Sequence, residues 1–332
     1  MTAKRFRPDS ERPKGKHQFR RARPGQESMT FGVSRPRPGM RLDQYLMNRF
    51  TGYSRNFLQT MIKEGRVLVD GRRAKPSSAV TPGNEIVVNL PEGMSREPED
   101  LDLDVIYRDG NVFAINKRPG LVVHPARGHT TGTILQGIFH LFREELAEDP
   151  TFQVGPVHRL DIGTSGLLLC AYGEQTRKFL QSQFEHRQIQ KTYLAICHGE
   201  PAFDETEVDA AIGIEPEHEK TYMVDGKAAR PALTRFVCLG RGGGYGLLRA
   251  EPHTGRTHQI RLHAAHIGHP LVGDVMYGGK RQDDAGNPLL DRAALHSSTL
   301  TFIHPATGEQ TMLSAPLFAD MREFAEKHGL GE

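Results

Sequence analysis

The most constraining feature of this chain is a short apolar run at residues 167–171, bounded by Gly166 and Gly173. A run this short and continuous, closed by glycines, is typical of a buried β-strand. The segment that leads into it carries two charged residues, Arg159 and Asp161. A rigid strand can hold such a side chain in a fixed position, as a binding or catalytic group requires.

Asp161 has two interpretations from residue types alone. A carboxylate near a core is costly unless it is paired, and Arg159 is only two residues away. Asp161 is therefore either half of a structural ion pair at the strand entrance or a functional carboxylate.

The full string around Asp161 resembles a known signature. His-Arg-Leu-Asp at 158–161, followed by Thr-Ser-Gly-Leu-Leu-Leu at 164–169, is similar to that of the pseudouridine synthases of ribosomal large-subunit and some transfer RNAs. In that family the Asp is catalytic, so the resemblance implies this role for Asp161. It also implies that His158 and Arg159 bind RNA, with Arg159 occupying the space that a flipped base leaves.

Residues 40–90 form a second pattern. Apolar side chains at helical spacing predict helices over 42–50 and 54–65, followed by short strands at 67–69 and 86–90. Arg-Leu-Asp, then Ser-Arg, then Gly-Arg-Val-Leu-Val-Asp-Gly resembles the RNA-binding domain first recognised in a small-subunit ribosomal protein, the S4 domain. Its expected RNA-binding residues are Arg41, Arg55, Lys63 and Arg66, and Asp43 is expected to pair with an arginine. The alternative is a small α+β module with a solvated charged face.

Positive charge is concentrated at the front of the chain. Residues 1–38 contain 11 Lys and Arg against 3 Asp and Glu, and residues 40–90 contain 8 against 4, although the net charge is only +3. This asymmetry indicates a polyanionic partner that the N-terminal third engages first. Residues 1–39 are rich in Arg, Pro and Gly, so we expect a disordered arm with loose phosphate contacts. The alternative is a solvated tail without function.

A larger domain is expected over residues 105–325, after a Pro- and acid-rich linker at 91–104. The segment 116–125 also resembles the synthase family, where it borders the RNA cleft. Lys117 is expected to bind RNA there, although it could equally be a surface charge. Further along we expect a helix at 133–142, an acidic loop at 144–149, a helix at 174–186 with Phe179, Leu180 and Phe184 inward, a strand at 191–197, a polar surface excursion at 204–230, and strands at 234–239 and 246–251.

Two further motifs complete the resemblance. Tyr193 matches the active-site tyrosine of the family's second motif; without the resemblance it is an ordinary half-buried strand tyrosine. Gly-Arg-Thr-His-Gln-Ile-Arg at 255–261 resembles the third motif, whose basic residue pairs with the catalytic Asp. By position that residue is Arg261, with Arg256 the weaker candidate and an expected RNA contact.

His263, His266 and His269 are spaced by three and resemble a metal-binding face. Metal-binding helices more often use an i, i+4 pair with a nearby acid, and no acidic residue lies between His253 and His269. We therefore expect no metal here.

The resemblance implies an α+β fold: a mixed, mainly antiparallel sheet with flanking helices, plus the small S4-like domain. It implies an RNA pseudouridine synthase that flips a uridine out of its stack, with Asp161, Tyr193 and Arg261 in the active site. The isomerisation needs no cofactor. The alternatives are a non-catalytic RNA-binding or ribosome-assembly factor, and a metal-dependent hydrolase that uses the histidines.

The expected partner is large-subunit ribosomal RNA or another structured RNA, bound by a monomer. No membrane contact is expected, since no apolar run reaches the roughly 20 residues that a membrane span needs. The three cysteines lie far apart and form no Cys-x-x-Cys pair. They are expected to be free thiols in a reducing, cytoplasmic compartment.

Overall fold

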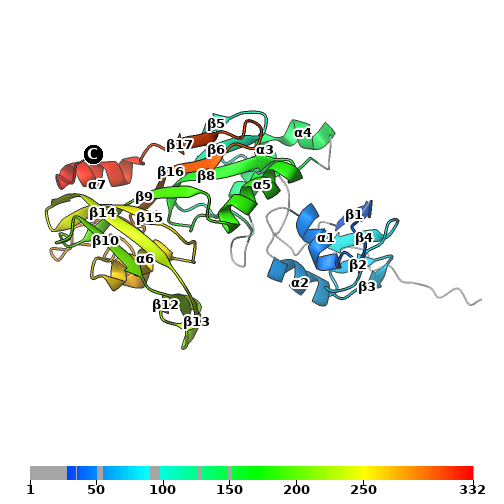
Figure 1. Ribbon diagram of the computed structural model, residues 1–332, viewed down its shortest axis with the longest axis horizontal. Coiled ribbons are helices and arrows are strands. Elements are labelled where there is room, and N and C mark those ends of the chain that lie inside the picture. The colour runs from blue at the N-terminus through cyan, green and yellow to red at the C-terminus, as the bar shows by residue number, and fades with distance from the viewer. Residues whose placement is uncertain are drawn as a thin grey trace, which may run out of the picture. The chain divides into compact units, whose positions relative to one another are not determined.

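The computed structural model of the protein describes residues 28–34, 36–50, 55–89, 98–125, 129, 131–148 and 152–331. The chain divides into two compact units (Figure 1). The N-terminal unit draws on described residues 28–46 and 55–89, and the C-terminal unit on 47–50 and 98–331. Within the described residues, no helix is both long enough and apolar enough to cross a bilayer.

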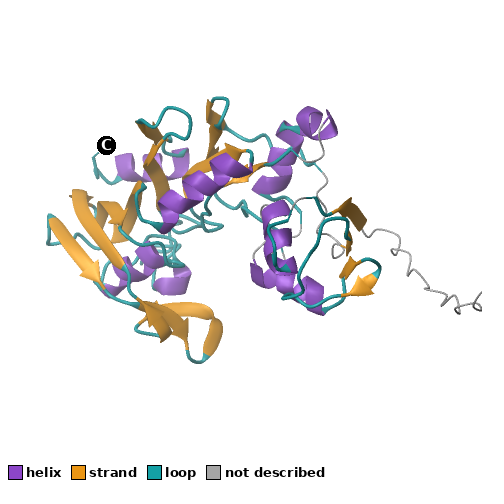
Figure 2. Cartoon of the chain, turned by 45° about the vertical axis from the view of Figure 1, so that its right-hand side comes forward, coloured by secondary structure: helices purple, strands orange, loops and turns teal. Residues whose placement is uncertain are grey.

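The N-terminal unit combines two helices with a small antiparallel sheet (Figure 2). Its elements are α1 (Leu42–Arg49), α2 (Arg55–Lys63) and, in sheet order, β1 (Ser28–Gly32), β4 (Glu85–Asn89), β2 (Val67–Val69) and β3 (Arg72–Arg73). Leu42 and Leu46 on α1 and Ile62 on α2 are buried, because the helical period places the apolar residues on one face. Asp70 and Gly71 both have positive φ, as a two-residue hairpin turn requires. The helices and strands predicted in this segment are confirmed.

Strand β1 corrects the expectation of a disordered arm over residues 1–39. It pairs with β4 in antiparallel register, from Ser28 opposite Asn89 to Gly32 opposite Glu85. Phe31 stacks on Tyr45 with ring centroids 6.5 Å apart, so this strand has an apolar contact that the surrounding Arg- and Pro-rich composition conceals. Residues 1–27 and residue 35 lie outside the described residues.

The C-terminal unit is built on one ten-stranded sheet. Its strands are β5 (Val105–Arg108), β6 (Val112–Lys117), β7 (Val154–Pro156), β8 (Ser165–Tyr172), β9 (Gln190–His198), β10 (Glu205–Asp209), β14 (Leu233–Gly242), β15 (Tyr245–Pro252), β16 (Leu295–Ile303) and β17 (Gln310–Ser314). Their order is β10-β14-β15-β9-β16-β8-β6-β5, with β17 on β16 and β7 on β8. Among the described strands every pairing is antiparallel except that of β16 with β8, so the sheet is mixed and mainly antiparallel, as expected.

The parallel pairing depends on Gly166. Its φ is +103°, and a Cβ at this position would lie 2.3 Å from the backbone oxygen of Ser297 on β16. Only glycine allows both this conformation and this approach. Because β8 follows directly after the loop of Asp161, the close contact with β16 also fixes where that loop ends.

Helices cover both faces of the sheet. They are α3 (Ile134–Leu141), α5 (Glu174–Glu185), α6 (Gln259–His266) and α7 (Ala319–Lys327). On β6, Phe113 and Ile115 join a core with α3, whereas Val112 and Ala114 join a second core with α5. In the other half of the sheet, α6 and α7 contribute to two further cores. The run at 167–171 is continuous for this reason, since its residues alternate between two buried faces.

Two local predictions are wrong, and a third is made more specific. The polar surface excursion expected at 204–230 contains β10 and a separate sheet of β11 (Ile212–Glu215), β12 (His218–Val224) and β13 (Lys227–Arg230). The acidic stretch after residue 143 is helix α4 (Arg143–Glu148), not a loop. Phe179 on α5 is 43% exposed, whereas Leu180 is buried and Phe184 partly buried. Strands and helices with exposed polar faces lack the apolar periodicity on which the predictions relied.

The expected linker at 91–104 is in part bound to the C-terminal unit. The backbone N–H of Gly132 donates to the Glu99 carboxylate at 2.7 Å, and Leu103 packs on the core beside α3. Residues 90–97 lie outside the described residues.

Candidate active site

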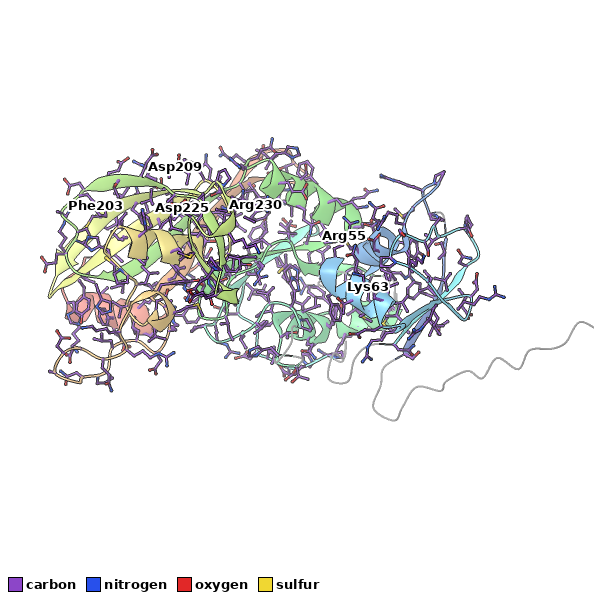
Figure 3. All side chains as sticks on the ribbon, turned by 90° about the horizontal axis from the view of Figure 1, so that it is seen from below. Arg55, Lys63, Phe203, Asp209, Asp225 and Arg230 are labelled. Carbon is purple, nitrogen blue, oxygen red and sulfur yellow. The ribbon has the colours of Figure 1, made fainter. Side chains whose placement is uncertain are left out.

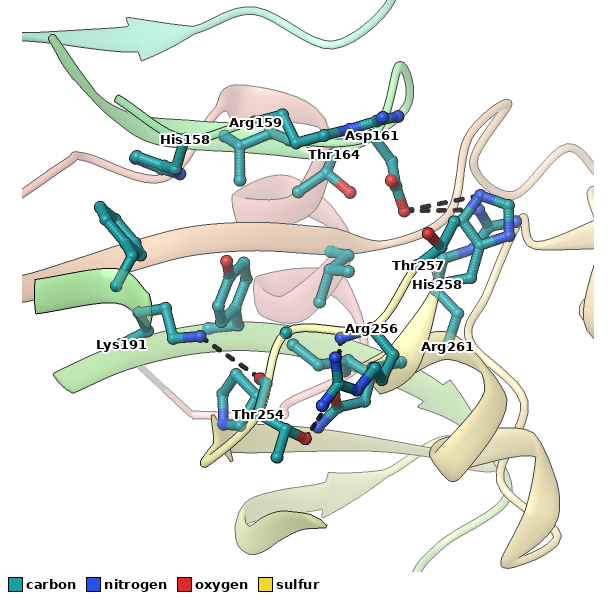
Figure 4. A pocket seen from close by; sticks show the side chains of 18 of the residues that line it. His158, Arg159, Asp161, Thr164, Lys191, Thr254, Arg256, Thr257, His258 and Arg261 are labelled. Carbon is teal, nitrogen blue, oxygen red and sulfur yellow. Dashed lines mark hydrogen bonds and ion pairs between the residues drawn. The ribbon is translucent and has the colours of Figure 1, made fainter. Parts of the chain in front are cut away.

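A pocket of about 290 Å³ lies where the loop before β8, strand β9 and the start of α6 meet (Figure 4). Its charged and polar lining includes Arg159, Asp161, Lys191, Tyr193, Arg256, His258 and Arg261. The three residues predicted to be catalytic, Asp161, Tyr193 and Arg261, therefore share one pocket although they are far apart in the sequence.

Asp161 lies on a turn in which the backbone carbonyls of residues 161–163 all accept hydrogen bonds. Its own carbonyl accepts a hydrogen bond from the Thr164 N–H at 3.1 Å. The carbonyl of Ile162 accepts from the Gly120 N–H at 2.8 Å and from Lys117 Nζ at 3.2 Å. The carbonyl of Gly163 accepts from Arg292 Nη1 at 3.2 Å. A backbone fixed in this way limits where the carboxylate can point.

Lys117 supports this turn, and its expected RNA contact is corrected. The side chain is fully buried, and the ammonium donates to three backbone carbonyls at 2.9 to 3.2 Å. Burial lowers the pKa of Lys117 to about 7, with a further lowering by Arg292 that Asp161 opposes. In sequence, a lysine beside Arg-Pro-Gly looks like a surface residue, so only the tertiary structure shows this role.

The Asp161 carboxylate faces the pocket and is 22% exposed. Arg261 Nη1 and His258 Nε2 lie 3.7 and 3.8 Å from its Oδ2 (Figure 4). Both distances are too long for a hydrogen bond. Among the described residues, the carboxylate accepts no hydrogen bond, so its oxygens are available to a ligand.

Arg261 is held mainly by a residue that sequence reasoning missed. Its Nε and Nη2 donate to the two carboxylate oxygens of Asp274, each at 2.6 Å, and its guanidinium lies 4.9 Å from the ring centroid of Tyr277. Burial disfavours the charged guanidinium, but the hydrogen bonds and charge of Asp274 outweigh it and raise the pKa of Arg261. Arg261 is therefore a fixed positive charge beside Asp161, with Asp274 as its closer partner.

His258 and Tyr277 also belong to the site and were missed. His258 precedes α6 with φ +56°, and its Nδ1 lies 2.7 Å from the Tyr277 hydroxyl, at the end of the short 3-10 helix η1 (Val275–Tyr277). His258 lies within the motif at 255–261, in which the resemblance implied roles only for the two arginines. Nothing in the sequence marked Tyr277.

Tyr193 lies on β9, opposite Ser297 of β16, and lines the pocket. Burial raises the pKa of Tyr193 to about 12; a hydrogen bond with Ser297 lowers it and Asp161 raises it further. The phenol is therefore protonated at neutral pH. Lys191, two residues earlier, donates to the Thr254 carbonyl at 3.3 Å, and burial lowers its pKa to about 8.

The two basic residues before Asp161 differ. Arg159 is exposed at the pocket, as its expected contact with RNA requires. The ring of His158 accepts the Leu169 N–H at 2.9 Å and packs on Phe184 at 4.9 Å between centroids. Burial, with a smaller effect of Lys191, lowers the pKa of His158 to about 3. The ring is therefore neutral and engaged with the backbone, and it also lines the pocket, so its expected RNA contact stays a prediction.

Arg256 lines the other side of the pocket. Its Nε donates to the Pro231 carbonyl at 3.2 Å, and burial together with the charges of Arg230 and Arg187 lowers its pKa. Like charges near a pocket favour an anion such as a phosphate.

In the N-terminal unit, Arg41 and Arg55 both bond the buried Asp43, as expected for Asp43, and each keeps an exposed part of its side chain. Arg66 is paired with Glu64 at 2.9 Å. Lys63 is exposed at the end of α2, where Figure 3 labels it together with Arg55 at the start of the helix.

Two of the three histidines spaced by three, His263 on α6 and His269 after it, make hydrogen-bond contacts within the fold. Both ring nitrogens of His263 are engaged, by Thr234 Oγ1 and the Ala210 carbonyl at 2.9 Å each. His269 contacts the His198 carbonyl at 3.1 Å. Among the residues with described positions, no three His, Cys, Asp or Glu side chains are grouped so as to hold a metal ion.

Two family models match the chain: "RNA pseudouridylate synthase" over residues 111–266 and "S4 domain" over residues 40–86. An uncharacterized RNA pseudouridine synthase of Bacillus subtilis (strain 168) is 36% identical over 290 residues, which cover 86% of this chain and 93% of that protein. Ribosomal large subunit pseudouridine synthase D of Escherichia coli (strain K12) is 36% identical over 309 residues, which cover 90% of this chain and 93% of the relative.

Solved structures show the same fold. Human RNA pseudouridylate synthase domain containing 1 superposes with a TM-score of 0.51 at 26% identity, over 67% of this chain and 86% of that one. Human RNA pseudouridylate synthase domain containing 4 gives a TM-score of 0.55 at 22% identity, over 68% and 92%.

Proposed function

Because this chain belongs to the family of RNA pseudouridine synthases, we propose that it isomerises uridine to pseudouridine in large-subunit ribosomal RNA. The isomerase class follows from relatives at 36% identity over most of the chain. The ribosomal substrate is an inference from the relative of Escherichia coli that is named for it. Such a substrate places the protein in the cytoplasm.

The observation that carries the proposal is the Asp161 carboxylate. It faces a pocket, it is held in place through its backbone, and its oxygens accept no hydrogen bond within the described residues. A structural carboxylate at a strand entrance would be saturated by donors. This one is left open, with the guanidinium of Arg261 as a fixed positive charge 3.7 Å from its Oδ2.

The reaction breaks the bond from N1 of uracil to C1′ of the ribose and forms a bond from C5 to C1′. The proton on C5 leaves and N1 gains one, so atoms and electrons balance without redox change. Asp161 attacks as a carboxylate nucleophile or acts as a base at the sugar; both are compatible with its position at the pocket. Tyr193 packs on the base. As a protonated phenol it donates a hydrogen bond more readily than it removes the C5 proton.

The target base must leave its stack to reach the pocket. Arg159 is exposed beside Asp161 and has a side chain long enough to occupy the vacated space. Arg256 then contacts the phosphate backbone from the α6 side, and the exposed cations of the S4-like unit bind RNA phosphate independently of sequence.

The test is a deletion strain whose ribosomal RNA is mapped for pseudouridine, followed by complementation with the wild-type chain. We expect one or a few large-subunit positions to lose and regain the modification. In vitro, the purified chain should release tritium from RNA labelled at uracil C5. Unchanged large-subunit RNA in the deletion strain would overturn the substrate assignment, and absence of release from any RNA would overturn the activity.

A further inference from the structure

We propose that His258 is a positioning residue for Asp161: its neutral imidazole presents an Nε2–H to the carboxylate, and the Tyr277 hydroxyl holds the ring in that orientation. This inference rests on the proposed function, since it assigns a role in the same site. His258 acts through Asp161 and is not itself assigned a contact with the substrate.

The geometry places the imidazole between two groups. Nε2 lies 3.8 Å from Asp161 Oδ2 and Nδ1 lies 2.7 Å from the Tyr277 hydroxyl. The ring is 17% exposed and makes edge-on contacts with Tyr222 and Tyr277, at 6.1 and 5.6 Å between centroids. These two contacts and the bond to the Tyr277 hydroxyl leave the ring little freedom to turn. We expect the separation of 3.8 Å to shorten to a hydrogen bond in the complex with RNA, as catalytic hydrogen bonds commonly do.

The proton positions follow from the partners. Burial raises the pKa of Tyr277 to about 12, in spite of Arg261 and a backbone hydrogen bond from Tyr222, so the phenol is protonated at neutral pH. Its oxygen accepts from the Tyr222 backbone, and we assign its O–H as the donor to Nδ1 of His258, an arrangement that uses both the donor and an acceptor site of the hydroxyl. In a neutral imidazole the proton must then be on Nε2, the nitrogen that faces Asp161.

The charge state follows from every group around the ring. Burial lowers the pKa of His258 below its usual 6.5; Asp161 and Asp274 oppose this, and Arg261 and Arg159 add to it. Tyr222 of β12 and Tyr277 of η1 pack edge-on against the ring. At neutral pH the ring is therefore a neutral donor, which orients the carboxylate without neutralising its charge.

The backbone at His258 allows a clean experiment. With φ +56° the residue lies in the left-handed region, which glycine adopts without strain. His258→Gly therefore removes the imidazole and leaves the start of α6 in place. His258→Gln returns an N–H donor at nearly the position of Nε2. His266→Gln makes the same change at an exposed histidine of the same helix.

Full-length variants are compared by single-turnover tritium release at saturating RNA and by RNA affinity. We expect His258→Gly to lose at least about tenfold in rate, with RNA affinity within about twofold, because one charge-oriented hydrogen bond is lost. His258→Gln should recover most of the rate, Tyr277→Phe should lose less than His258→Gly, and His266→Gln should match the wild type.

The pH profile separates positioning from a merely structural role. In the wild type the rate should fall at acid pH, below the range in which an ordinary histidine titrates, because a protonated imidazole forms an ion pair with Asp161 and reduces its reactivity. In His258→Gln this fall should shift to lower pH. Equal profiles, or a His258→Gly rate within twofold of wild type, overturn the proposal. The wild type and Asp161→Asn, measured alongside, test the proposed function separately. Absence of release from every RNA by the wild type would overturn that function whatever the His258 variants do, and release by Asp161→Asn would overturn the role of Asp161.

Discussion

The chain contains the tripeptide Arg-Leu-Asp twice, at 41–43 and at 159–161, and the two copies have opposite surroundings. In both, the leucine is buried. In the N-terminal unit the Asp43 side chain is fully buried and accepts hydrogen bonds from Arg41, Arg55 and Gln59 and from the next backbone N–H. In the C-terminal unit the Asp161 carboxylate is partly exposed and accepts none within the described residues.

The difference lies in how many acceptor sites are filled. A carboxylate can accept about four hydrogen bonds. Those of Asp43 are taken by donors from its own helix and from α2, which lowers its pKa and makes it structural. Those of Asp161 stay open, because the groups around it fix its backbone and leave its oxygens facing a pocket. Catalytic availability is therefore a property of the surroundings and not of the tripeptide.

The largest effect is expected from removing the charge beside Asp161. Arg261→Met should reduce turnover by about 100-fold or more, because the carboxylate loses its fixed counter-charge. The double change with Asp274→Asn avoids leaving a buried unpaired carboxylate and should show the same rate loss in a stably folded protein. Single-turnover tritium release measures it. A double variant with wild-type rate would remove Arg261 from the site.

A smaller loss is expected when the turn of Asp161 is loosened. Lys117→Met removes the donor to three carbonyls while keeping a buried chain of similar length. Turnover should fall about tenfold to 100-fold through misplacement of the carboxylate, with little change in RNA affinity. Binding and rate are measured on the same preparation. A loss confined to RNA affinity would return Lys117 to the role of an RNA contact.

The arginines of the two tripeptides should also differ. Arg159→Ala should slow turnover about tenfold for a uridine in structured RNA and less for an unpaired uridine, because flipping an unpaired base costs less. Arg41→Ala should change the turnover of neither RNA, since Arg41 is bonded to Asp43. Equal losses of Arg159→Ala on the two RNAs would leave plain phosphate binding as its role.

The smallest effect on activity is expected at Asp43. Asp43→Asn should destabilise the N-terminal unit by about 2 kcal/mol, through loss of charge-assisted hydrogen bonds, and leave the turnover of bound RNA unchanged. Since the pKa of Asp43 is lowered in the folded state, its stabilising contribution is present above the unfolded pKa of about 4 and is lost as the pH falls below it. Unfolding by urea at pH 7 and pH 3 measures this. A wild type and variant with equal pH dependence would contradict the assignment.

The sequence predicted the parts of this molecule that depend on local pattern. The strand at 167–171, the helix at 174–186 and the pocket residues Asp161, Tyr193 and Arg261 were placed by apolar runs and motif strings. The structural roles of Lys117 and His158 were not predicted, because these side chains are buried by strands and loops that are distant in sequence. Asp274 and Tyr277 were missed for the same reason: they reach the site from a loop without periodicity or a recognised motif.

The central claim is that the open carboxylate, and not its saturated counterpart, performs the chemistry. The most direct measurement places the same nearly isosteric change, Asp→Asn, at residue 161 and at residue 43 and follows tritium release from C5-labelled RNA at saturating concentration. We predict that Asp161→Asn binds RNA normally but loses release by at least about 1,000-fold, whereas Asp43→Asn releases at the wild-type rate. Release by the Asp161→Asn variant at a rate near that of the wild type would contradict the account.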